Sequence, residues 1–82
     1  MAKVKFSDLR ESSQRALISQ ELAQQNGGTM PQVTNFTIGK SPYDNDPDGE
    51  LISAQTEIGQ WLLVWSSEDK EFTTVMKENQ NV

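Results

Sequence analysis

The chain has 82 residues, no cysteine and no histidine, and a formal net charge of −5. Without these two residue types there is no disulfide, no serine–histidine or cysteine–histidine nucleophile system and no zinc site with nitrogen or sulfur ligands. The length predicts a single domain over residues 1–82, with short disordered tails at 1–4 and 78–82. Only 34% of the residues are hydrophobic, so the core must be thin.

The charge is unevenly distributed along the chain. Residues 1–40 carry five basic and three acidic side chains, whereas residues 41–82 carry two basic and nine acidic ones. A negative surface repels the phosphate backbone, so we expect no direct binding of nucleic acid. The same surface suits a protein partner with a basic groove, although solubility alone also explains a modest net charge.

No segment has the composition of a membrane anchor. A membrane-spanning helix needs about 20 apolar residues, and no stretch of this chain approaches that length. The first residues also lack the apolar run of a signal peptide. We therefore expect a cytoplasmic protein that does not bind membranes.

The first predicted element is a helix over residues 7–25, or two short helices with a break near Ser12-Ser13. Ser7 is a good N-cap, and no glycine or proline interrupts the segment. Asn26-Gly27-Gly28 then supplies a C-cap and a stop. Apolar residues recur at roughly helical spacing: Phe6, Leu9, Ala16, Leu17, Ile18, Leu22 and Ala23.

Four strands are predicted to follow, over residues 33–38, 51–56, 61–65 and 71–76. Each is rich in β-branched, aromatic or other apolar residues, and Pro47-Asp48-Gly49 has the chemistry of a hairpin turn. The fold class is thus α+β. We expect the N-terminal helix, or two short helices, to pack on one face of an antiparallel β-meander of about four strands.

Aromatic side chains are expected to fill much of the core. Trp61 and Trp65 lie four residues apart in one predicted strand, which favours a shared buried face over an exposed site. In the last strand, strict alternation places Phe72, Thr74 and Met76 on one face. The residues predicted to carry the core are Phe36, Trp61, Leu63, Trp65 and Phe72.

Alternating carboxylates form the sharpest local pattern. Asp44, Asp46 and Asp48, followed by Gly49, resemble the start of a calcium-binding loop, in which oxygens at positions 1, 3 and 5 bind the ion. The twelfth position is Gln55, however, where such loops carry a bidentate glutamate. A calcium site, a solvated acidic turn and an acidic contact surface for a protein all remain open.

Catalytic function is not indicated. The carboxylates gather in turns and tails, no glycine-rich phosphate loop is present, and a chain of this size leaves little room for a substrate cleft. We therefore expect no enzymatic activity and no cofactor.

The C-terminal half resembles a known family. The residues that carry the resemblance are Tyr43-Asp44, an acidic turn ending in Asp48 and Glu50, Leu51-Ile52-Ser53, Trp61-x-Leu63-Val64, and a strand ending in Met76. Upstream, Glu11-Ser12 looks like the Glu-Ser pair on the edge strand of that family. The family is the phage-type uracil-DNA glycosylase inhibitors, which are small, acidic, cysteine-free α+β proteins.

The resemblance implies inhibition by DNA mimicry, with carboxylates in place of phosphates in the DNA-binding groove of the enzyme. Glu11 and Ser12 would contact the catalytic groove. An apolar pocket between helix and sheet would wrap a protruding apolar side chain of the enzyme, and the residues that could line it are Ile18, Leu22, Ile38, Leu51 and Leu63. The other residues expected to bind the partner are Glu21, Asp44, Asp46, Asp48 and Glu50.

The sequence thus favours a small acidic protein that binds and inhibits a DNA-processing enzyme, with uracil-DNA glycosylase as the first choice. Two alternatives stay open. One is a protein-interaction or regulatory module without DNA mimicry, and the other is a structural module that binds calcium through Asp44, Asp46 and Asp48.

Overall fold

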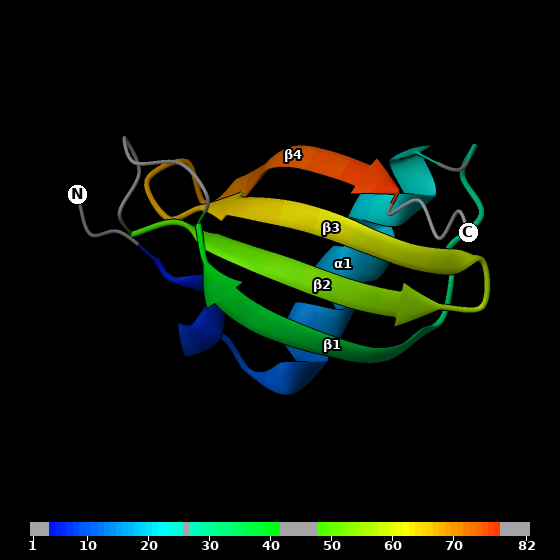
Figure 1. The fold of residues 1–82 in the computed structure, drawn as a ribbon, viewed down its shortest axis with the longest axis horizontal. Helices are drawn as coiled ribbons and strands as arrows, with labels where there is room; N and C mark the ends of the chain where they lie inside the picture. The colour runs from blue at the N-terminus through cyan, green and yellow to red at the C-terminus, as the bar shows by residue number, and fades with distance from the viewer. Residues whose placement is uncertain (1–3, 26, 42–47, 78–82) are drawn as a thin grey trace, which may run out of the picture.

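A computed structural model describes residues 4–25, 27–41 and 48–77 of the chain. The elements in chain order are η1 (Phe6–Asp8), α1 (Glu11–Gln25), β1 (Val33–Lys40), β2 (Glu50–Thr56), β3 (Gly59–Ser66) and β4 (Glu71–Lys77). The four strands form one antiparallel sheet in the order β1-β2-β3-β4, and α1 lies behind it (Figure 1). The predicted α+β fold is confirmed.

The N-terminal helical region is divided, but not where the sequence predicted. The break falls at Leu9 and Arg10 rather than near Ser12-Ser13, which lie in the first turn of α1. Leu9 N–H donates to the carbonyl of Phe6 and closes the short 3-10 helix, which the full burial of the Phe6 side chain holds in place. The predicted cap residue Ser7 lies inside η1.

A single stripe of α1 faces the sheet. Gln14, Ile18 and Leu22 follow each other at intervals of one helical turn, and all three are buried. Gln14 is the polar member of the stripe, and its Nε2 donates to the carbonyl of Phe6 at 2.8 Å. The helix ends as predicted: Gly28 has positive φ, and its N–H donates to the carbonyl of Ala23 at 2.7 Å.

Aromatic residues from four elements, η1, β1, β3 and β4, pack together at one end of the core. Phe6 lies against Phe36, Trp65 and Phe72, with ring centroids 6.5, 5.3 and 5.5 Å away. The prediction that Trp61 and Trp65 are core residues is confirmed, because both are buried. The whole cluster of buried residues comprises Phe6, Ile18, Leu22, Val33, Ile52, Ala54, Trp61, Leu63 and Trp65, with Phe36 and Phe72 packed against it.

A β-bulge changes which face the end of β4 presents. The register shifts between Val64 and Trp65, which pair with Thr74 and Phe72. Val75, opposite Leu63, therefore joins Phe72 against the core, and Met76 points to the other face. Met76 is 51% exposed, so the prediction that it shares a face with Phe72 is wrong.

Val4, which the sequence assigned to the N-terminal tail, is hydrogen-bonded to the rest of the fold. Residues 1–3 and 78–82 lie outside the described residues, but Val4 does not. Its N–H donates to the carbonyl of Ser67 at 3.0 Å, and its own carbonyl accepts a hydrogen bond from Trp65 Nε1 at 2.8 Å. These two contacts fasten the start of the described chain to β3 and the turn that follows it.

Candidate functional site

Two chain connections meet at one end of the sheet. Because consecutive strands run antiparallel, the β1–β2 connection and the β3–β4 turn lie at the same end, on the left in Figure 1. Both carry carboxylates. We call this region the acidic end and define it by Asp48, Glu68, Asp69 and Glu71, of which the last three are exposed.

Backbone geometry fixes the β3–β4 turn. Lys70 adopts a φ of 59°, and its N–H donates to the carbonyl of Ser66 at 2.8 Å. The Ser66 hydroxyl accepts a second hydrogen bond from Asp69 N–H at 3.1 Å. The turn therefore holds Glu68 and Asp69 at its exposed tip while their backbone stays tied to β3.

Basic side chains lie among these carboxylates. Lys70 belongs to the turn itself, and Lys40 ends β1 beside the start of β2. Lys5 lies on the N-terminal segment that is fastened to the same end through Val4. The four carboxylates of the acidic end outnumber these three ammonium groups, so the described side chains there carry a modest negative charge.

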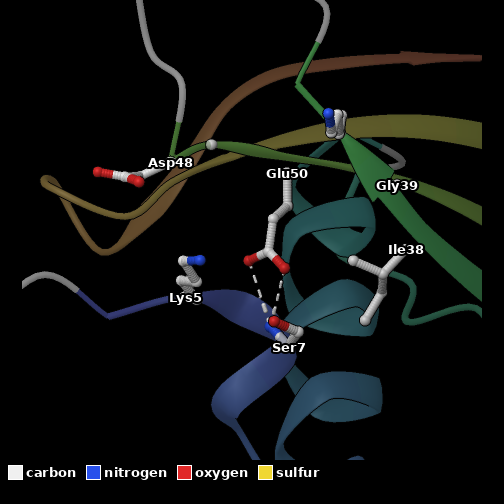
Figure 2. A pocket seen from close by; sticks show the side chains of 8 residues that line it. Lys5, Ser7, Ile38, Gly39, Asp48 and Glu50 are labelled. Atoms are coloured by element: carbon white, nitrogen blue, oxygen red, sulfur yellow. Dashed lines mark hydrogen bonds between the residues drawn. The ribbon is translucent and has the colours of Figure 1, made fainter.

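A cavity of about 440 Å³ opens at the acidic end. It lies where the N-terminal segment, the end of β1 and the start of β2 meet (Figure 2). Acidic and basic side chains both reach it, so its chemistry favours neither an anion nor a cation. The lining residues are Lys5, Ser7, Ile38, Gly39, Lys40, Asp48, Gly49 and Glu50.

Glu50, one of the residues expected to bind the partner, is buried and points toward the N-terminal segment. It is only 9% exposed, and its carboxylate accepts hydrogen bonds from the backbone N–H groups of Phe6 at 2.5 Å and Ser7 at 3.2 Å. These donors open η1 and have no partner within the helix, so Glu50 acts as its cap. In Figure 2 the Glu50 carboxylate points toward Ser7, whereas Asp48 points away from it.

The helical candidates lie on α1, which covers the other face of the sheet. Glu11 and Ser12 are exposed in the first turn of α1, and Glu21 is half-buried further along it. Glu11 forms an ion pair with Arg15 at 3.1 Å. The resemblance implied an edge strand for Glu11-Ser12, and the structure shows a helix on the far side of the sheet from the viewer in Figure 1.

The apolar candidates do not form an open pocket. Ile18, Leu22 and Leu63 are fully buried and fill the space between helix and sheet, so they present no surface to a partner in this structure. Ile38 is half-buried against the same core. Leu51 lies on the opposite face of the sheet, because its neighbour Ile52 points into the core.

The calcium hypothesis is only partly covered by the structure. Asp44 and Asp46 lie outside the described residues, and Asp48 lies within them. Among residues 4–25, 27–41 and 48–77, no cluster of three or more histidine, cysteine or acidic side chains is arranged to hold a metal ion.

Within the same ranges no helix is long and apolar enough to cross a membrane.

Two features escaped the sequence analysis. The cap formed by Glu50 joins residues 44 positions apart, and no local pattern signals such a contact. The second is the face of the sheet opposite α1. The sequence did contain a sign of it, because Ser53 and Leu62 alternate with buried residues in adjacent strands.

Comparisons with protein-family models, characterised proteins and solved structures find no match to this chain.

Proposed function

We propose that the protein binds and inhibits a DNA-processing enzyme by presenting carboxylates where DNA presents phosphates. Uracil-DNA glycosylase is the first enzyme to test, because of the sequence resemblance. The observation that carries the proposal is the meeting of carboxylates from two separate connections, Asp48 from one and Glu68, Asp69 and Glu71 from the other, at one end of the sheet.

The mechanism that we propose is occlusion of a basic DNA-binding groove. The net charge of −5 and the exposed carboxylates would attract a basic surface and accelerate encounter. Affinity among related complexes is set mainly by the dissociation rate. Slow dissociation of the inhibitor from the enzyme would depend on a second contact near the carboxylates, from which water is excluded. The proposal places the protein in the cytoplasm. It involves no catalysis, no cofactor and no direct binding of nucleic acid.

The test is the uracil-excision activity of a purified glycosylase, titrated with this protein at low and at moderate salt. We expect stoichiometric loss of activity that weakens as salt rises, because salt screens interactions between exposed charges. Full activity at a large excess of the protein would exclude this enzyme as the target. The protein would then be an interaction module with a different partner.

A matched pair of variants tests the position of the charge. Glu68 lies in the β3–β4 turn and Glu57 in the β2–β3 turn at the opposite end of the sheet, and both are exposed. Glu68→Gln and Glu57→Gln remove the same charge with the same substitution. We expect inhibition to weaken only with Glu68→Gln, and equal weakening by both would show that net charge alone matters.

A further inference from the structure

The face of the sheet opposite α1 carries an ordered arrangement of uncharged side chains. The strand registers place them in three rows that run across the strands. We call this the uncovered face. The row nearest the acidic end is Gly39, Leu51, Val64 and Thr74; the middle row is Thr37, Ser53, Leu62 and Met76; the far row is Asn35, Gln55 and Gln60.

Several observations agree on this assignment. Gln60 Nε2 donates to Ser53 Oγ at 2.9 Å, so these two side chains share the face. The intervening residues Ile52 and Leu63 are fully buried on the other side. No described helix lies over the rows, as Figure 1 shows with the sheet toward the viewer.

The uncovered face lacks charge, as the centre of a protein–protein interface does. None of its eleven positions is charged, although 23% of the residues in the chain are. Depletion of charged residues distinguishes the centres of protein–protein interfaces from ordinary surface. Leu51, Leu62 and Met76 are the accessible apolar residues of the face, and they surround Val64, which is itself only 4% exposed.

The far part of the face is hollowed rather than flat. A shallow depression of about 100 Å³ is lined by Thr37, Ser53 and Gln60, among others. A larger one of about 300 Å³ continues from Gln55 and Gln60 to the end of the sheet. The amide and hydroxyl groups around them can donate and accept hydrogen bonds.

The order of the rows selects the kind of partner. Carboxylates of the acidic end come first, then the apolar block, then the amides. Two copies of the chain could pack face to face, with the two middle rows in contact and the strands of one copy reversed relative to the other. The acidic end of each copy would then lie against the uncharged amides of the other, and its carboxylates would gain no electrostatic attraction. A partner with basic residues beside an apolar contact would satisfy both parts of the surface.

The size of the face leads to the same conclusion. Four strands about 4.8 Å apart, with about seven residues at about 3.3 Å each, cover roughly 400 Å². A standard interface buries about 800 Å² on each partner. An interface of that size must therefore extend beyond the three rows. The acidic end adjoins the rows and can supply part of the remaining area.

We propose that the uncovered face is the docking surface of this protein, and that its occupant is a protein whose basic residues meet the acidic end while an apolar patch covers Leu62 and Met76. This inference rests on the proposed function and specifies the contact that slows release. It assigns the desolvated part of the interface to the face of the sheet that α1 leaves open.

A matched pair of methionines tests the inference. Met76 on the uncovered face and Met30 in the loop before β1 are 51% and 55% exposed, so Met76→Gln and Met30→Gln make the same change at equal exposure. With purified glycosylase as the probe, we expect Met76→Gln to weaken inhibition roughly tenfold, and Met30→Gln to have no effect. Leu62→Gln serves as a second variant, and thermal unfolding confirms that each variant is folded.

The salt dependence identifies the kind of contact. The loss caused by Met76→Gln should persist at high salt, because burial of apolar surface is not screened, whereas the effect of Glu68→Gln should disappear. If the wild type inhibits and both Met76→Gln and Leu62→Gln inhibit equally well, the inference is overturned and the proposed function stands. If the wild type does not inhibit, the proposed function fails for this enzyme and the inference falls with it. Sedimentation showing a dimer that Met76→Gln dissociates would overturn it in favour of a second copy.

Discussion

The carboxylate of Glu50, at the start of β2, accepts a hydrogen bond from the backbone N–H of Phe6, 44 residues earlier in the chain. The same side chain also accepts from Ser7 N–H. The contact joins the N-terminal segment to the sheet and places the Phe6 ring in the core. A residue whose charge suggests a surface contact is therefore part of the internal structure.

Removing this cap should destabilise the fold. We expect Glu50→Ala to lower the free energy of unfolding by about 2–3 kcal/mol, because it removes a charged acceptor and leaves the buried N–H of Phe6 unsatisfied. Chemical denaturation measures the change. Glu57→Ala is the control, since the Glu57 carboxylate also accepts from a backbone N–H, that of Gln32, but in exposed surroundings. Equal losses in the two variants would contradict the role assigned to burial.

The Phe6 side chain should be among the most costly to truncate. It is fully buried and lies against three aromatic rings. Phe6→Ala should cost about 3–5 kcal/mol, which could unfold a domain of this size, so Phe6→Leu is the more informative variant, with a smaller loss. Leu9→Ala, at a partly buried neighbouring position, gives the comparison. A loss from Phe6→Leu no larger than that from Leu9→Ala would show that the aromatic contacts contribute little.

The left-handed conformation of Lys70 offers a stabilising substitution. A side chain at a φ of 59° is strained, and glycine adopts this region freely. We expect Lys70→Gly to raise the free energy of unfolding by about 1 kcal/mol, and Lys70→Val to lower it. Thermal unfolding of the two variants measures the difference. Stabilisation by Lys70→Val would refute the argument from backbone strain.

Calcium should leave the melting temperature unchanged if the acidic turn is a contact surface. A ligand that binds only the native state raises that temperature. Thermal unfolding with millimolar calcium and with a chelator distinguishes the cases. A clear rise with calcium that Asp48→Asn abolishes would support the calcium module instead.

Local patterns predicted the strands and the two core tryptophans well, because hydrophobic alternation and turn chemistry act over a few residues. They failed where a distant contact decides the outcome. The burial of Phe6 and its cap from Glu50 end the first helical segment before Ser12-Ser13. The bulge opposite Val64 reverses the face of Met76, and no residue type in β4 signals it.

The candidate site was less predictable than the fold. Ile18, Leu22 and Leu63 have the residue types of an apolar pocket, but the same types build the core, and only packing distinguishes the two roles. Part of the uncovered face, in contrast, could have been found from the sequence, because uncharged residues alternate with core residues in β2 and up to Leu63 in β3. The position of Met76 on that face could not, because it depends on the bulge.

The attachment of Val4 to the turn after β3 has a practical consequence for handling the protein. The described chain starts at Val4, whose N–H is bonded to Ser67 at the acidic end, and it leaves β4 at Lys77 at the opposite end of the sheet. An affinity tag or surface anchor joined before Val4 would stand beside Glu68 and Asp69. One joined after Lys77 would extend from the other end, so immobilisation through the C-terminus keeps the acidic end accessible in a binding assay.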